Sequence, residues 1–191
     1  QDLIRDELDD DRVRVAQIGP GGENLVRYGN ITNDLGHFNG RNGLGAVMGS
    51  KNLKAIAVRG TKSIELADKE KVLEINRWTA KEGMKNPLAE TLHELGTLAG
   101  VRGNYEAGVL PTRNWNKGQF AGVDEIEGKT WKDTIGKDGK GCFACPIRCK
   151  RVVEVKEGPY KVDPKYGGPE YETVGALGSI LEIDSREVIA K

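Results

Sequence analysis

Three cysteines within eight residues are the strongest chemical signal in this sequence. Cys142, Cys145 and Cys149 stand in the spacing C-x2-C-x3-C, and the chain has no other cysteine. A tight loop can point three thiolates toward one metal centre, and an iron–sulfur cluster is held by four such thiolates. Pro146 follows the second cysteine and fixes φ there, which stiffens the loop. Positive charge that would offset a thiolate-bound cluster is found nearby at Arg148, Lys150 and Arg151.

Other roles for three neighbouring cysteines fit this pattern less well. A disulfide would leave one thiol over, and the cysteines are closer together than an ordinary disulfide cross-link requires. A structural zinc site needs four ligands, and the only histidines, His37 and His93, lie far from the cysteines in sequence. The motif of radical enzymes has the reverse order, C-x3-C-x2-C, and does not match. The best interpretation is an iron–sulfur cluster whose fourth ligand lies elsewhere.

A glycine-rich stretch, Asn33–Ser50, is the second candidate site. Five of its glycines fall between Gly36 and Gly49, and Arg41 stands among them. Glycines at this density let backbone N–H groups approach a phosphate or a flat heterocycle, and a guanidinium can bind either. The dinucleotide template G-x-G-x-x-G is not met, because Met48 stands at its last position. A flexible glycine loop without a ligand is the alternative.

Two carboxylates form the third candidate site. Glu170 and Glu172 follow a Gly-Gly-Pro turn, and a helix of small and apolar residues is expected after them, over Val174–Ile183. Paired carboxylates can serve acid–base catalysis. The alternative is structural, because acidic side chains at a helix start interact favourably with the helix dipole.

The bulk composition excludes some classes of function. The 191 residues include 29 Lys and Arg against 29 Asp and Glu, so the formal net charge is zero. This balance argues against a nucleic-acid-binding protein, which normally carries a basic excess. No apolar run is long enough for a membrane helix, and no signal peptide is recognised. We therefore expect a cytoplasmic protein with no membrane partner.

Both ends of the sequence suggest part of a longer chain. Gln1 is not an initiator methionine. Asp184 with Glu187 three residues on predicts a helix N-cap and capping box. The helix that would follow has only a few residues before Lys191, and so short a helix is hardly stable alone.

Hydrophobic periodicity in the first third predicts mostly strands. The acidic segment Asp2–Asp11 is expected to be helical, because Leu3, Ile4 and Leu8 share a face. A turn is expected at the Gly-Pro-Gly-Gly run. The predicted strands are Arg12–Ile18, Glu23–Thr32 and a buried Leu53–Val58.

From Thr61 the pattern becomes helical. Asp68 is expected to cap a helix running to about Lys85, and Pro87 to begin another that Gly96 ends. His93 lies beside the apolar stripe of that second helix, so a surface position is expected. Gly100–Phe120 is expected to be irregular, with packing as the main role of Arg113, Trp115 and Phe120, and Arg151–Glu157 to be a strand. The whole is predicted to be an α+β fold.

Four segments, in order, resemble the tungsten-containing aldehyde:ferredoxin oxidoreductase family. Gly40–Ile56 resembles its pterin-binding signature, and the cysteine motif resembles its cluster loop. Gly168–Thr173 resembles its active-site segment, and Leu110–Trp115 is also similar. The resemblance covers essentially the whole chain, and four matches in the same order are far more specific than one.

The resemblance implies a domain assignment. Residues 1–65 would be the C-terminal part of a β-rich pterin-binding domain, and 66–191 the N-terminal part of a mainly helical domain carrying the cluster loop. The residues matching the family's pterin contacts are Arg41, Asn42, Gly43, Leu44 and Gly45. Asn42 departs from the family pattern, since many relatives have Gly or Ala there. The family's fourth cluster cysteine, active-site histidine and later pterin contacts match nothing in this sequence.

The resemblance also implies a reaction. An aldehyde and water would give a carboxylic acid and two electrons at a tungsten or molybdenum bis-molybdopterin centre. The electrons would pass through a 4Fe-4S cluster, bound by Cys142, Cys145 and Cys149, to ferredoxin or another electron-transfer subunit. Glu172 is the first choice for acid–base catalysis and Glu170 the second. A homo-oligomer is implied. The alternatives are the active-site subunit of an aromatic acyl-CoA reductase and a non-catalytic iron–sulfur electron-transfer module.

Overall fold

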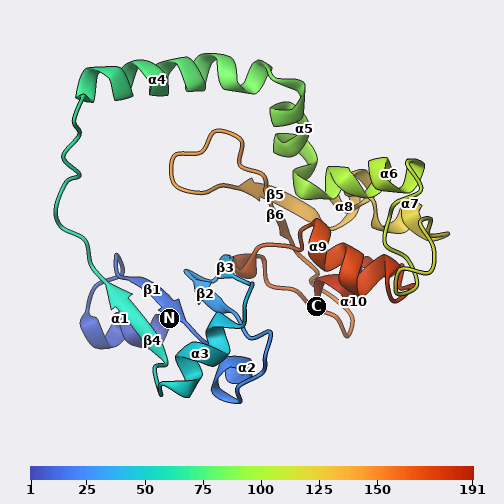
Figure 1. The fold of residues 1–191 in the computed structure, drawn as a ribbon, viewed down its shortest axis with the longest axis horizontal. Coiled ribbons are helices and arrows are strands. Elements are labelled where there is room, and N and C mark those ends of the chain that lie inside the picture. The colour runs from blue at the N-terminus through green and yellow to red at the C-terminus, as the bar shows by residue number, and fades with distance from the viewer. The chain divides into compact units, whose positions relative to one another are not determined.

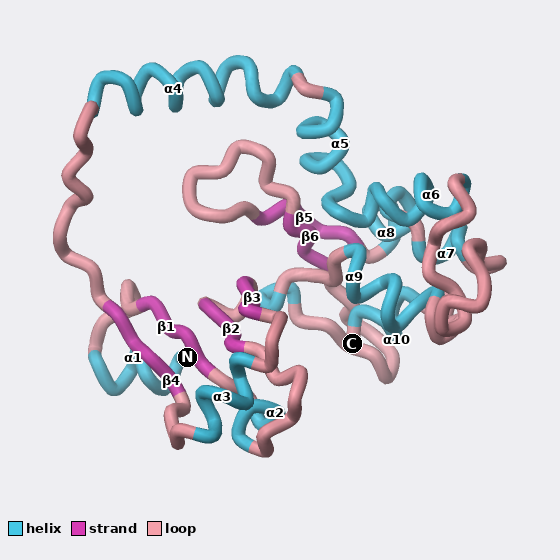
Figure 2. Tube along the Cα trace, viewed as in Figure 1, coloured by secondary structure: helices cyan, strands magenta, loops and turns pink.

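The computed structural model describes all residues, 1–191, and divides them into two compact units, Gln1–Glu65 and Leu66–Lys191. Figure 1 shows their elements, and Figure 2 shows the distribution of helix, strand and loop. Both units contain helices and a sheet, so the expected α+β class is confirmed. No helix combines the length and apolarity needed to cross a membrane.

The first unit is built on a four-stranded antiparallel sheet in the order β3-β2-β1-β4. Strand β1 is central, because its residues pair with β2 on one side and with β4 on the other. The small core of this unit contains Val13, Val15, Ile18 and Met48. Its elements are α1 Asp2–Leu8, β1 Arg14–Gln17, α2 Pro20–Glu23, β2 Ile31–Asn33, β3 His37–Asn39, α3 Leu44–Ser50 and β4 Ala55–Val58.

Several expectations for this unit were wrong. The turn expected at the Gly-Pro-Gly-Gly run is the start of α2, because Pro20 occupies the first helical turn, where its missing N–H costs nothing. The strand expected over Glu23–Thr32 is confined to its end, and Leu25 has φ 56°, which no strand allows. The alternative interpretation of the glycine-rich segment, a flexible loop, does not describe all of it, because the segment contains β3 and α3.

Strand β4 is placed as expected but is not buried. Ile56 is 48% exposed and Val58 is 56% exposed. The strand pairs only with β1, so it lies at the edge of the sheet. Its continuous apolar sequence was therefore misleading about burial.

The second unit is mainly helical, with one antiparallel pair of strands, β5 Gly136–Lys140 and β6 Lys150–Val153. Its α-helices are α4 Lys69–Glu82, α5 Pro87–Leu95, α6 Ala99–Glu106, α7 Val123–Ile126, α8 Gly128–Thr134, α9 Tyr171–Val174 and α10 Arg186–Ala190. Shorter helical segments are the 3-10 turns η1 Gly83–Lys85, η2 Gly96–Leu98 and η3 Pro164–Tyr166, and the π-helix η4 Gly175–Ser179.

The predicted cap of α4 and the predicted start and end of α5 are confirmed. The Asp68 carboxylate accepts from the Lys71 N–H at 2.8 Å. Asn86 caps α5 by accepting from Leu88 and Ala89, and Pro87 occupies its first turn. Gly96 ends α5 with φ 65°, a conformation that glycine adopts without strain.

The core of the second unit joins its helices to β6. Trp131 of α8 is the largest fully buried side chain, and Val153 of β6 lies in the same cluster. The other buried members are Leu98, Val101, Leu110, Phe120, Val123, Ile126, Val174 and Ile189. This cluster fixes α6, α8, α9 and β6 as one scaffold beneath the candidate site.

Four expectations for this unit needed correction. Gly100–Phe120 begins with α6, whose Val101 is fully buried, so packing overrides its glycines. Phe120 is buried as expected, but Trp115 is 71% exposed. The helix expected through Ile183 gives way to the π-helix η4, and Glu182 has φ 56°. Ser185, not Asp184, caps α10, because the Ser185 hydroxyl accepts from the Val188 N–H.

Candidate functional site

The three cysteines lie in the loop that connects β5 to β6. The last strand pairs before the loop are Gly139 with Arg151 and Lys140 with Lys150. Within the loop the Cys145 N–H donates to the Cys142 carbonyl at 3.1 Å, which forms a tight turn. A two-stranded pair thus brings both ends of the cysteine segment together.

The cysteines are free thiols at the surface. Cys142 is exposed, and Cys145 and Cys149 are partly buried. No group of three or more His, Cys, Asp or Glu side chains is arranged to hold a metal ion in the structure. Chemically, the three sulfur donors fit three positions of a cluster that requires four thiolates. Their role as ligands therefore remains a prediction.

The end of α5 contacts the cysteine loop. His93 Nδ1 lies 2.8 Å from the Ile147 carbonyl oxygen. Arg151 donates to the Glu94 carbonyl at 2.9 Å and to the Arg148 carbonyl at 2.6 Å. His93 is exposed, as expected, but the contact was not anticipated. Nothing in the sequence pattern pairs two positions 54 residues apart.

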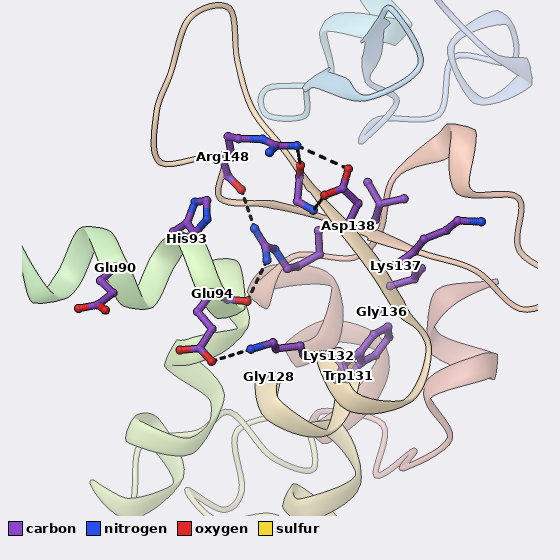
Figure 3. Close-up of a pocket in the computed structure, with 14 residues that line it drawn as sticks. Glu90, His93, Glu94, Gly128, Trp131, Lys132, Gly136, Lys137, Asp138 and Arg148 are labelled. Atoms are coloured by element: carbon purple, nitrogen blue, oxygen red, sulfur yellow. Dashed lines mark hydrogen bonds and ion pairs between the residues drawn. The ribbon is translucent and has the colours of Figure 1, made fainter. Parts of the chain in front are cut away.

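A cavity of about 570 Å³ lies between α5, α8 and the strand pair (Figure 3). On one side, Arg148 donates to the Gly139 carbonyl and lies 3.5 Å from an Asp138 carboxylate oxygen. On another side, Lys132 donates to Glu94 at 2.6 Å, and this hydrogen bond lowers the pKa of Glu94. Two ion pairs, Arg148 with Asp138 and Lys132 with Glu94, therefore line the cavity wall.

Arg151 is partly buried beside the cysteines. Burial lowers the pKa of its guanidinium from the usual value, and the charge of Cys149 opposes that shift. Its Nε atom is buried without a hydrogen-bond partner. The side chain therefore acts through its two terminal nitrogens, both of which donate to carbonyl groups.

The two candidate carboxylates stand at the start of α9. Glu170 is the N-cap residue and is partly buried, but its side chain makes no capping hydrogen bond. Glu172 lies in the first turn of α9 and is exposed. The helix-start alternative also fits this placement.

Residue Tyr171, between the two carboxylates, is held from two directions. Its backbone N–H donates to the Thr97 hydroxyl at 3.0 Å, and its own hydroxyl accepts from the Asn104 amide at 2.7 Å. Both partners come from η2 and α6. These contacts fix where the first turn of α9 starts.

A left-handed turn packs against the other end of this helical segment. Arg113, Asn114 and Trp115 all have positive φ, at 48°, 50° and 68°. The N–H groups of Arg113 and Asn114 donate to the carbonyls of Ser179 and Ile180 at 3.1 Å. The turn thus closes the C-terminal end of the π-helix, and π-helical segments are frequent at functional sites.

The glycine-rich segment shows a packing role for three of its glycines, Gly43, Gly45 and Gly49; a Cβ on Gly49 would lie 2.0 Å from the Gly22 carbonyl oxygen. A Cβ on Gly43 would lie 2.2 Å from the Arg27 carbonyl oxygen, and one on Gly45 would lie 2.4 Å from that of Asn30. Arg41, Asn42 and Leu44 are exposed. Asn42 has φ 64°, a left-handed conformation that asparagine tolerates better than most residues.

The structure brings two of the three sequence-predicted sites into one unit. The cysteine loop leads into β6, and the Val153 N–H of β6 donates to the Gly167 carbonyl just before the carboxylate segment. The glycine-rich segment lies in the first unit.

Comparison with protein families matches both units. Residues 1–60 match the model described as aldehyde ferredoxin oxidoreductase, N-terminal domain, and residues 74–191 match the one described as domains 2 & 3. The second match covers more than half of the chain. This chain belongs to the aldehyde ferredoxin oxidoreductase family.

Individual relatives agree. The tungsten-containing aldehyde ferredoxin oxidoreductase of Pyrococcus horikoshii is 42% identical over 186 residues, covering 95% of this chain and 29% of the relative. That of Pyrococcus furiosus is 40% identical over 185 residues. An aliphatic sulfonate oxidoreductase, WOR-like subunit, of Pyrococcus furiosus is 35% identical over 178 residues. The chain spans 29% of the length of these two tungsten-containing aldehyde ferredoxin oxidoreductases.

A solved structure shares the fold. The active site complex BamBC of benzoyl coenzyme A reductase matches 96% of this aldehyde ferredoxin oxidoreductase family chain and 29% of its own, with a TM-score of 0.66. Identity is 24%, so the likeness concerns the fold alone.

Proposed function

We propose that the protein oxidises aldehydes to carboxylic acids and delivers the electrons to ferredoxin or another electron-transfer subunit. The observation that carries the proposal is the ordered set of glycine-rich segment, cysteine loop and carboxylate segment. It occurs in a chain 42% identical to a tungsten-containing relative. In the overall reaction, RCHO + H2O gives RCOOH, two electrons and two protons.

Each site has a proposed role. A tungsten or molybdenum bis-molybdopterin, when bound, supplies the two-electron redox chemistry. Arg41 and the segment Asn42–Gly45 contact the pterin or its phosphate. Cys142, Cys145 and Cys149 hold three irons of a 4Fe-4S cluster, and a thiolate outside this sequence holds the fourth.

Glu172 handles the proton in this proposal. A carboxylate base takes a proton from the water that adds to the aldehyde carbon, and such a base contributes roughly 10²–10⁴-fold to the rate. Glu172 is preferred to Glu170 because it projects from the first turn of α9, whereas Glu170 is the residue that begins the helix. Tyr171 and its partners Thr97 and Asn104 hold the backbone that carries both.

The remaining assignments follow the family. We propose that 1–65 is the end of the pterin-binding domain and 66–191 the start of the cluster-carrying helical domain. The protein is proposed to be cytoplasmic, to act on a small aldehyde and to form a homo-oligomer. The acyl-CoA reductase alternative has weaker support, because its structural relative is only 24% identical.

An aldehyde-oxidation assay tests the proposal. The protein is purified anaerobically from cells grown with tungstate and mixed with a panel of aliphatic and aromatic aldehydes and an oxidised viologen dye. Aldehyde-dependent dye reduction with matching acid formation supports the proposal. Iron-containing protein that reduces no dye with any aldehyde would favour the electron-transfer module.

A further inference from the structure

The last turn of α5 contacts the cysteine loop through its side chains, its backbone and its terminal glycine. His93 reaches the Ile147 carbonyl, the Glu94 carbonyl accepts from Arg151, and Gly96 faces the Cys149 carbonyl. Two of these contacts reach the last third of the loop, at Ile147 and Cys149, and the third reaches Arg151 of β6, two residues after Cys149.

The His93 contact fixes a tautomer. A carbonyl oxygen only accepts hydrogen bonds, so Nδ1 of His93 carries the proton at 2.8 Å from Ile147. If asparagine replaced His93, its side-chain amide nitrogen would lie at a similar distance from the backbone as Nδ1 and could donate the same hydrogen bond. Phenylalanine at position 93 would fill a similar space but has no hydrogen-bond donor.

Arg151 links the helix end to the loop. The Glu94 carbonyl lies in the last turn of α5, where carbonyls have no partner within the helix. Arg151 donates to it and, through a second nitrogen, to the Arg148 carbonyl. Arg148 has φ 51°, so this second bond secures a backbone turn of unfavourable conformation just before Cys149.

Gly96 sets how closely the two segments approach. A Cβ at this position would lie 2.5 Å from the Cys149 carbonyl oxygen and 3.1 Å from the Arg151 side chain. Its φ of 65° also favours glycine. The backbone that carries the third cysteine therefore rests directly on the end of α5.

We propose that His93 and Arg151 are positioning residues for the cluster, holding the Ile147 and Arg148 carbonyls so that the Cys149 thiolate points in one direction. The inference rests on the proposed function, because it takes Cys149 as an iron ligand. Groups that orient metal ligands in this way typically affect metal affinity by 10–100-fold.

The test compares variants of the anaerobically purified holoprotein. His93→Phe and Arg151→Lys should release iron to a chelator about tenfold faster than wild type and change the electron paramagnetic resonance spectrum of the reduced cluster. Lysine keeps the charge but lacks the fork that reaches two carbonyls. His93→Asn should restore both the release rate and the spectrum. Glu90→Gln is the matched control, on the same helix and beside the same cavity.

The outcomes separate this inference from the proposed function. Wild-type protein without iron would overturn both. A wild-type four-iron cluster with unchanged release rate and spectrum in His93→Phe and Arg151→Lys would overturn only the positioning role. Failure of His93→Asn to differ from His93→Phe, with equal resistance to urea unfolding, would also overturn it. Wild-type iron release and a wild-type spectrum in His93→Asn, but not in His93→Phe, would support the positioning role.

Discussion

At the scale of single residues, Gly43 and Gly96 show how much glycine here serves close packing. Their φ angles are 63° and 65°, and each faces a carbonyl oxygen distant in sequence, that of Arg27 or of Cys149. A side chain at either position would collide with backbone. The high glycine content near Arg41 is therefore explained in part without a ligand, and the exposed Arg41 and Asn42 are left as the groups available to one.

Arg41→Ala should weaken retention of the pterin about tenfold, because one charge-assisted hydrogen bond contributes about 1.5 kcal/mol. The measurement is pterin content of the purified protein after extensive dialysis. Lys51→Ala, which removes one positive charge at the end of α3, is the control and should retain wild-type content. Equal pterin content in both variants would contradict the assignment of Arg41.

Glu172→Gln should keep tungsten and iron but lower turnover roughly 10²–10⁴-fold, because glutamine cannot accept the proton. Glu170→Gln is the matched variant in the same segment and should lose much less. Steady-state aldehyde oxidation, with metal content measured on the same samples, checks both. Equal turnover of the two variants would contradict the catalytic role of Glu172 and favour a structural role for both carboxylates at the start of α9.

At the scale of elements, local signals in the sequence predicted the helices with clear caps. Asp68, Pro87 and Gly96 each act within a few residues, so α4 and α5 could be placed. Strand β5 could not, because GKDGK has no apolar alternation and is a strand only through its pairing with β6. The cysteines were found from their spacing, whereas the role of His93 depends on a contact between distant segments.

The left-handed turn Arg113–Trp115 carries a prediction at this scale. Asn114 has φ 50° and is exposed, so a β-branched residue there is strained while losing little packing. Asn114→Val should lower the free energy of unfolding by about 1–2 kcal/mol. Asn114→Gly, the matched control, should remain within about 1 kcal/mol of wild type. Urea unfolding measures the free energy of unfolding of both variants. Equal values would contradict the expected backbone strain of valine at position 114.

At the scale of the whole molecule, the chain combines two units that carry different candidate sites. The first carries the glycine-rich segment, and the second carries the cysteine loop and the carboxylates on one scaffold. Three thiolates cannot complete a cluster that needs four, and the chain spans 29% of the length of its relatives. The proposed reaction therefore depends on groups that these residues do not supply.

Metal analysis of the anaerobically purified protein tests the central claim most directly. The proposal of a pterin-bound redox metal together with an iron–sulfur cluster predicts about one tungsten or molybdenum atom and about four iron atoms per chain. Both should be retained through gel filtration with a chelator present. Iron without tungsten or molybdenum, after growth with both metals supplied, would contradict the proposed aldehyde oxidation. It would favour a non-catalytic electron-transfer module.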